Sequence, residues 1–168
     1  LASRVLGGDG VVMAFEPSPD AFQMMNRNIA LNNCRNIFIY EHAIAPTKTT
    51  IFLDTSDHGN SGAAHISENG ISVAAQPITM SDVLTVTDHK NIFVKIDTEG
   101  FEFEVLKGLH EVLESHLVRA LVVEIDEVNL SRYGSSAAEV YDYLRSLGFA
   151  PEKGLGFGHY DEVFIAQY

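Results

Sequence analysis

Acidic side chains follow two apolar segments at the points where buried strands would end. Residues 92–96 form a largely apolar run, and Asp97 and Glu99 come soon after it. Residues 11–15 are also apolar and stop at Glu16. In an open α/β sheet, ligands bind outside the carboxyl ends of the strands, where such side chains meet. The two segments therefore predict one site that gathers carboxylates from two strands.

A single acid at the end of a strand has a specific use in nucleoside binding. Glu16 could accept hydrogen bonds from both ribose hydroxyls of a nucleoside-containing cofactor. The alternative is a solvated acid at a strand end. NAD-dependent oxidoreductases also place an acid after their second strand, so this residue alone does not choose among nucleoside cofactors.

Three carboxylates lie close together in the sequence just after residues 92–96. Asp97 could hold the amino group of a cofactor, orient an acceptor hydroxyl or act as a base, which needs reach first and a suitable pKa second. Crowding with Glu99 and Glu102 could raise a carboxylate pKa. Alternatively, these two residues favour the start of a helix, and for Glu102 this structural role is the prediction. Lys95 is expected to neutralise one of the acids.

A third acidic segment raises the question of a metal. Glu124 and Asp126 end another apolar run, and with Asp97 and Glu99 they could form an oxygen-ligand site for a hard divalent cation. The sequence does not fix such a geometry, and we expect a site without a metal.

Composition limits the class of protein. The chain has 168 residues, of which 46% are hydrophobic and 20% charged, as in one soluble globular domain. Its net charge of −12 argues against nucleic acid or an anionic membrane as a partner. No apolar run is long enough to span a bilayer. The single cysteine, Cys34, allows no internal disulfide and favours a cytoplasmic location.

Strand and helix patterns alternate along the chain, which predicts an α/β sheet. The last two strands flank the glycine-rich residues 154–158 with no helix between them, so they should form an antiparallel hairpin. Residues 54–69 are polar and predict a long loop that carries acceptor specificity. Strands are expected at 11–16, at 37–40 running on to 42–44, and at 49–53, 71–75, 77–79, 92–96, 120–125, 149–151 and 163–166. Helices are expected at 1–6, 18–31, 79–84, 102–113 and 136–147.

Two blocks together carry a resemblance to a known family. Residues 12–22 (VMAFEPSPDAF) and 95–102 (KIDTEGFE), followed by VLKG at 105–108, resemble the FkbM family of S-adenosylmethionine-dependent methyltransferases. The resemblance implies a Rossmann-like class I methyltransferase fold, with a mostly parallel sheet and an antiparallel C-terminal hairpin. It also implies a single methyltransferase domain over residues 1–168. The implied reaction is O-methylation of a hydroxyl on a sugar, a polyketide or a similar small metabolite.

The resemblance assigns roles to the residues at the strand ends. Residues 37–40 correspond to the third strand of the family. The loop that follows them would lie against adenine, where the small Ala43 lets the backbone approach the base. The alternative is an ordinary strand end. Pro17 would shape the turn under the adenosine. The expected cofactor-binding residues are Glu16, Pro17, His42, Ala43 and Asp97, and the expected catalytic residues are Asp97 and Glu99.

The chain departs from the family at its beginning. The family opens with a strand and a glycine-rich turn that wraps the methionine end of the cofactor, and neither occurs here. We therefore expect a domain that is incomplete at its N-terminus and lacks its first strand. An upstream segment, or a second copy of the chain in a homo-oligomer, should cover the exposed strand edge. A non-catalytic, methyltransferase-like binding module is an alternative, as is an NAD-dependent oxidoreductase, which KIDTEGFE and the final hairpin do not support.

Overall fold

The computed structural model describes residues 1–7, 10–54, 65–67, 70–88 and 91–168. The strands are β1 (Val12–Phe15), β2 (Ile37–Tyr40), β3 (Ala43–Ile44), β4 (Thr49–Asp54), β5 (His65–Ile66), β6 (Ile71–Gln76), β7 (Ile92–Ile96), β8 (Val118–Asp126), β9 (Phe149–Pro151) and β10 (His159–Ala166). The helices are α1 (Ala2–Leu6), α2 (Pro19–Leu31), α3 (Met80–Val86), α4 (Glu102–Gly108), α5 (His110–Glu114), α6 (Glu127–Arg132) and α7 (Ala137–Ser146).

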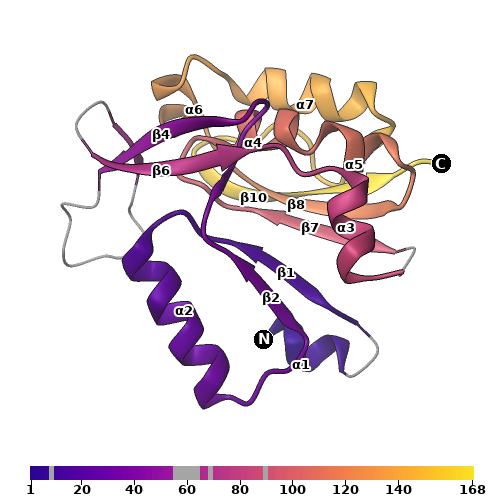
Figure 1. Ribbon diagram of the computed structural model, residues 1–168. Helices are drawn as coiled ribbons and strands as arrows, with labels where there is room; N and C mark the ends of the chain where they lie inside the picture. Colours follow the sequence, from indigo (N-terminus) through magenta and orange to yellow (C-terminus); the bar gives the residue numbers. More distant parts are fainter. Residues whose placement is uncertain (8–9, 55–64, 68–69, 89–90) are drawn as a thin grey trace.

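The described strands form three sheets, with the orders β1-β2, β3-β6-β4-β5 and β7-β8-β10-β9. The α/β class is as predicted. The predicted single, mostly parallel sheet is wrong for the described strands. Among them β1 pairs only with β2, and β4 and β6 belong to a separate sheet (Figure 1). The segment 71–75, expected at an edge, is an interior strand, and 77–79 is not a strand. The strand expected to run from 37–40 on to 42–44 ends at Tyr40, and residues 43–44 form β3 in another sheet.

Parallel pairing sets the direction of the strands that matter for the site. β1 and β2 are parallel, and so are β7 and β8, in which Ile96 lies beside Val123. β10 runs antiparallel to both β8 and β9, and the glycine-rich segment 154–158 lies in the connection before β10. The last two strands thus pair as the sequence predicts.

Capping residues explain where two helices begin. Ser18 precedes α2, and its side chain accepts a hydrogen bond from the backbone N–H of Ala21. Thr79 and Asp82 form a reciprocal capping box at the start of α3. Most of the predicted specificity loop, residues 55–64 and 68–69, lies outside the described residues. No helix in the described part of the chain is long and apolar enough to cross a bilayer.

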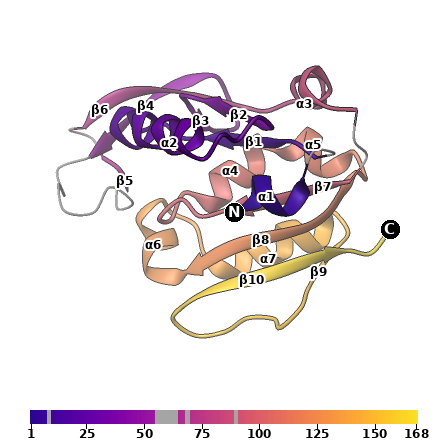
Figure 2. The ribbon, with the colours of Figure 1, turned by 90° about the horizontal axis from the view of Figure 1, so that it is seen from below.

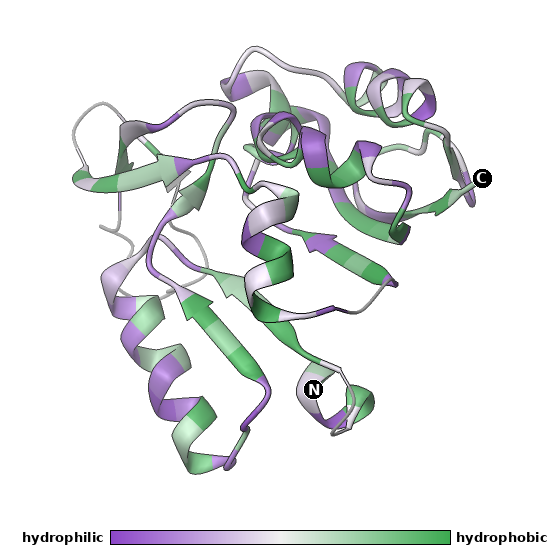
Figure 3. Ribbon diagram, turned by 45° about the vertical axis from the view of Figure 1, so that its right-hand side comes forward, coloured by the Kyte–Doolittle hydropathy of each residue, from purple (hydrophilic) through white to green (hydrophobic). Residues whose placement is uncertain are grey.

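The core lies on one face of the sheet that contains β7, β8 and β10. Helices α4, α5 and α7 cover this face, and their apolar side chains pack against the strands (Figure 1). The hydropathy colours show apolar residues along β1 and β2 and mixed residues along α2 (Figure 3). The core side chains with no exposed surface are Leu106, Leu113, Val118, Leu121, Val123, Leu130, Val140, Tyr141, Leu144 and Phe164.

On the opposite face of this sheet, no helix of the described residues covers β8 and β10 (Figure 2), so this face is open. Glu162 and Phe164 of β10 both contact Tyr141 of α7, so they point to the helical face. Side chains alternate along a strand, and Asp161 and Val163 therefore point the other way. Figure 2 looks onto β8 and β10 with α7 behind them. Any ligand over these two strands would approach from this open face.

A gap separates β1 from β7. A cavity of about 510 Å³ lies between them, lined by Met13 and Phe15 of β1 and by Phe93 and Val94 of β7, among other residues. In the described part of the chain neither strand has a backbone partner on the edge that lines this gap. Phe93 is 70% exposed there. The gap places the ends of β1 and β7 on opposite sides of one opening.

Candidate active site

A cavity of about 780 Å³ opens at the carboxyl ends of β1 and β7. Its volume is in the range of small-molecule and cofactor sites. Apolar side chains form much of its wall, and acids lie at the two strand ends. The structure brings every sequence-predicted site residue to this cavity: Glu16, Pro17, His42, Ala43, Asp97 and Glu99.

Glu16 is oriented by the turn that follows it. Its Oε1 accepts a hydrogen bond of 2.8 Å from the backbone N–H of Ser18. Burial raises the pKa of the Glu16 carboxyl, and the Ser18 N–H opposes this shift. The contact aligns the carboxylate at the cavity wall, where it can accept hydrogen bonds from a ligand.

Aromatic rings cluster at the ends of β1 and β2. Phe15 stacks on Tyr40 with a centroid separation of 4.9 Å, and the ring of His42 lies 5.4 Å from Phe15. His42 Nδ1 is 2.9 Å from the carbonyl oxygen of Ala43. A carbonyl only accepts, so this nitrogen carries the proton. Phe15 and His42 of this cluster line the Glu16 side of the cavity.

Asp97 continues from the end of β7 and forms an ion pair with Lys95, two residues earlier. The expected neutralising role of Lys95 is therefore confirmed. The hydrogen bond with Asp97 raises the pKa of the Lys95 ammonium, and burial opposes this shift. Both side chains are about half exposed, so a ligand in the cavity could reach the Asp97 carboxylate.

Glu102 holds the turn between β7 and α4. It is 1% exposed, and its Oε1 accepts hydrogen bonds from the Thr98 backbone N–H (2.8 Å), the Thr98 hydroxyl (2.9 Å) and the Gly100 N–H (3.2 Å). Such a carboxylate is occupied by its own backbone and is not available to a ligand. The structural role predicted for Glu102 is thus confirmed, and its contacts fix the position of Asp97 and Glu99.

Glu99 has a left-handed backbone conformation, with φ of 54°. Its Oε2 accepts a hydrogen bond of 3.3 Å from the side-chain amide of Asn129, in α6. Gly100 follows with φ of 107°. A Cβ at Gly100 would lie 2.3 Å from the carbonyl oxygen of Asn129. The turn thus packs closely against α6, a helix that the sequence patterns do not predict.

Replacing Gly100 with alanine should destabilise the protein by about 3 kcal/mol, because the methyl group overlaps a backbone oxygen and the positive φ is strained. Gly134 is the matched control. It also has a positive φ, of 72°, but a Cβ there would meet no atom within 4 Å. Gly134→Ala should therefore cost only about 1 kcal/mol. Urea unfolding followed by circular dichroism measures both free energies of unfolding. Equal losses in the two variants would show that the Asn129 backbone moves to make room for the methyl group.

The end of β8 holds a buried acid beside a histidine. Glu124 is 6% exposed, and its Oε1 lies 2.8 Å from His159 Nε2, at the start of β10. Burial raises the pKa of Glu124, and the negative charge of Asp97 raises it further. In the sequence, Glu124 is a candidate metal ligand, whereas no pattern around His159 marks it as a site residue. Among the described residues, no group of three or more His, Cys, Asp or Glu side chains could hold a metal ion.

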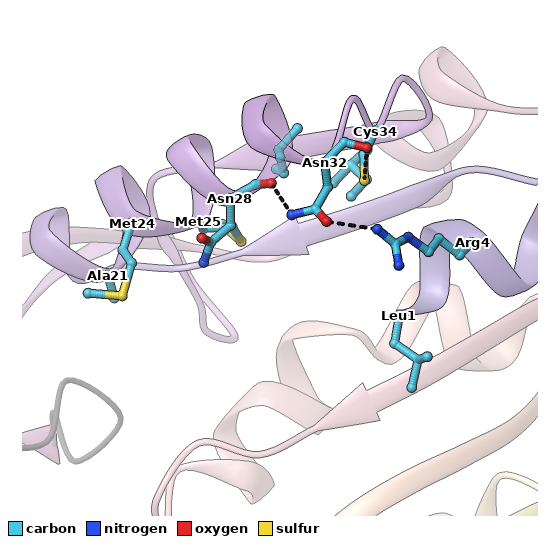
Figure 4. A pocket seen from close by; sticks show the side chains of 10 residues that line it. Leu1, Arg4, Ala21, Met24, Met25, Asn28, Asn32 and Cys34 are labelled. Carbon is cyan, nitrogen blue, oxygen red and sulfur yellow. Dashed lines mark hydrogen bonds between the residues drawn. The ribbon is translucent and has the colours of Figure 1, made fainter.

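A third cavity, of about 490 Å³, lies between α1 and α2 (Figure 4). Arg4 reaches across it and donates a 2.8 Å hydrogen bond to Asn32. Cys34 lies at the same end, with its Sγ 3.9 Å from the Asn32 carbonyl oxygen. None of the described residues that line this cavity is a predicted site residue.

Known proteins share sequence features with this chain. A family model described as the methyltransferase FkbM domain matches residues 1–151. The chain belongs to the FkbM methyltransferase family. The resemblance seen in the AFEPSP and KIDTEGFE blocks is therefore confirmed.

Two individual proteins are similar to this FkbM chain. The hexuronic acid methyltransferase AglP of Haloferax volcanii is 30% identical over 115 residues, which are 68% of this chain and 46% of AglP. The crystal structure of methyltransferase FkbM from Methylobacillus flagellatus KT matches with a TM-score of 0.58 at 15% identity, over 93% of this chain and 36% of that one. The structural match shows a shared α/β fold. The chain spans about half the length of the curated relative.

Proposed function

We propose that this chain is the catalytic domain of an S-adenosylmethionine-dependent O-methyltransferase. The observation that carries the proposal is the meeting of Glu16 and Asp97 in one cavity, from two strands that belong to different sheets. Membership of the FkbM methyltransferase family supports the same reaction class.

The lining of the cavity fits the parts of S-adenosylmethionine. Glu16 would accept hydrogen bonds from the ribose hydroxyls, and the wall formed by Phe15, His42 and Ala43 would contact the adenine. Asp97, on the far side of the gap, would hold the positively charged amino group of the methionine end. Pro17 would shape the turn below the adenosine.

The methyl donor supplies a carbon on a positively charged sulfur, which an oxygen can attack in line. Catalysis by this chain would come mainly from alignment of the two reactants and exclusion of water. Asp97 and Glu99 lie where the reactants would meet, and Glu99 is fixed there by Asn129. Glu99 would accept a hydrogen bond from the acceptor hydroxyl and so orient its oxygen.

The proposed acceptor is a hydroxyl of a sugar. The relative AglP is named for its action on a hexuronic acid, which offers several hydroxyls. Glu124, Asp126 and Asp161 lie at the paired ends of β8 and β10, next to Asp97 of the cavity. Their carboxylates are suited to accept hydrogen bonds from such hydroxyls. The chain's net charge of −12 does not suit a nucleic-acid acceptor.

Calorimetric titration of the full-length protein tests the proposal. S-adenosylmethionine and S-adenosylhomocysteine should both bind, because both carry the adenosine and the amino group. NAD shares the adenosine ribose but lacks the methionine end, and should bind much more weakly. Binding of NAD alone would contradict the proposal and favour an oxidoreductase. If none of the three compounds binds, a binding module without this cofactor would be favoured.

A further inference from the structure

His159 lies on the open face of the sheet, beside the end of β8. Its Nε2 is 2.8 Å from Glu124 Oε1, and its Nδ1 is 3.8 Å from Asp126 Oδ2. In the β8–β10 register, His159 lies opposite Asp126, and Asp161 lies opposite Glu124. The His159 side chain is 58% exposed, so a bound molecule can touch it.

Glu124 determines which nitrogen of His159 is available. It is buried to 94%, since only 6% of its surface is exposed. An ionised carboxylate only accepts hydrogen bonds, so the 2.8 Å contact places the proton of a neutral imidazole on Nε2. Nδ1 then carries the lone pair. A histidine oriented in this way by a buried carboxylate is the arrangement of a general base.

The second oxygen of Glu124 points to a ligand. Glu124 Oε2 is buried and has no hydrogen-bond partner among the described residues. An unpaired buried carboxylate oxygen costs free energy, and a donor from a bound molecule would remove that cost.

The strand register connects this pair to the cavity. Ile96 lies beside Val123, so the next residues, Asp97 and Glu124, are also neighbours across β7 and β8. Asp97 lines the cavity proposed for the methyl donor. Adjacent strands are about 4.8 Å apart, so an acceptor bound over β8 lies between Asp97 and His159.

We propose that His159, oriented by Glu124, is the general base that takes the proton of the acceptor hydroxyl. The inference rests on the proposed methyltransferase function. The acceptor oxygen forms a bond to the methyl carbon, the carbon–sulfur bond breaks, and its electron pair stays on the sulfur. The hydroxyl proton passes to His159 Nδ1. Asp126 Oδ2, 3.8 Å away, stabilises the positive charge that results.

Nitrogen-15 NMR of the histidine rings tests this geometry without an acceptor. The His159 signals are assigned from their loss in His159→Gln. At about pH 8, the neutral ring should carry its proton on Nε2, and Glu124→Gln should weaken that preference. A proton on Nδ1, or a ring that is indifferent to Glu124→Gln, would overturn the proposal. This result does not depend on whether the protein binds S-adenosylmethionine.

Kinetics test the role in catalysis, with methyl β-D-glucuronoside and methyl β-D-glucoside as acceptor probes. A base must be unprotonated, so wild-type kcat should fall as the pH is lowered and the base takes up a proton. His159→Gln should lower kcat at pH 8 by about 100-fold and remove this dependence. The affinity for S-adenosylmethionine should stay the same in calorimetry. The charged groups that face His159 are Glu124, Asp126, Asp161, Asp97 and Lys95.

His110→Gln is the matched control. His110 is half exposed and contacts Tyr143 of α7, on the covered side of the sheet. Its variant should keep the wild-type rate and pH profile. An unchanged rate in His159→Gln, or a wild-type rate that does not vary with pH, would overturn the proposed base. Loss of S-adenosylmethionine binding in the wild type would instead contradict the proposed function.

Discussion

Glu16→Gln should weaken the binding of S-adenosylmethionine by about 10- to 100-fold. A hydrogen bond to a charged group contributes about 1.5–3 kcal/mol, and the variant replaces one carboxylate oxygen with an amide that cannot accept. The remaining amide oxygen can still accept from the Ser18 N–H, so the turn after β1 should survive. Calorimetric titration measures the dissociation constant directly.

Glu41→Gln provides the matched control. Glu41 follows β2 as Glu16 follows β1, but it is exposed and lies outside the described lining of the cavity. Its replacement should leave the dissociation constant unchanged. Equal losses in the two variants would mean that general negative charge, and not a ribose contact, attracts the cofactor.

The Glu16 contact also has a predictable pH dependence. Burial raises the Glu16 pKa above the ordinary value of 4.5, and a ribose hydroxyl binds best to the ionised carboxylate. Affinity should therefore be full at neutral pH and fall as the pH drops through the raised pKa. The Glu16→Gln variant should lack this part of the pH profile.

A large loss of stability is expected at Glu162, which has no exposed surface. Its two oxygens accept hydrogen bonds from the backbone N–H groups of Lys153, Gly154 and Val163 and from the hydroxyl of Tyr141. In Glu162→Gln the side-chain NH₂ group replaces one of the accepting oxygens, so it faces N–H or O–H groups that then lose their acceptor. We expect the free energy of unfolding to fall by about 3 kcal/mol and the melting temperature by roughly 10 °C.

The pH dependence of unfolding gives a second test of Glu162. Burial alone would raise its pKa, but the hydrogen bonds it accepts outweigh burial and lower the pKa. A carboxyl with a lowered pKa stabilises the folded state above its unfolded-state pKa, and that contribution is lost as the pH falls through the folded-state value. The stabilities of wild type and Glu162→Gln should therefore converge in acid.

The exposed neighbour Glu152 is the control for both measurements. Glu152→Gln should change the free energy of unfolding by no more than about 0.5 kcal/mol at neutral pH, as is usual for surface substitutions. A Glu162→Gln variant as stable as this control would show that the loop before β10 repacks around the amide.

Local signals in the sequence accounted for the parts of the site that depend on neighbouring residues. Ser18 is a good helix cap wherever it occurs, and its position fixed the end of β1 and the start of α2. Two apolar runs that stop at Glu16 and Asp97 predict a shared site, and both residues do line one cavity, although β1 and β7 belong to different sheets.

Contacts between distant segments could not be predicted in the same way. His159 meets Glu124 only because β10 pairs with β8 in one particular register, and no local pattern specifies that register. Glu102 and Glu162 look like surface acids in the sequence, since charged residues are rarely buried. Their burial depends on backbone N–H groups that converge only in the folded chain.

The gap between β1 and β7 has a thermodynamic consequence. A ligand that contacts both Glu16 and Asp97 bridges two sheets that no described backbone hydrogen bond joins. Part of its binding free energy must therefore fix the distance between them. A polypeptide strand held in the gap would fix that distance in advance and so raise the affinity for the ligand. Because such coupling is reciprocal, the bound ligand would strengthen the hold on that strand by the same factor.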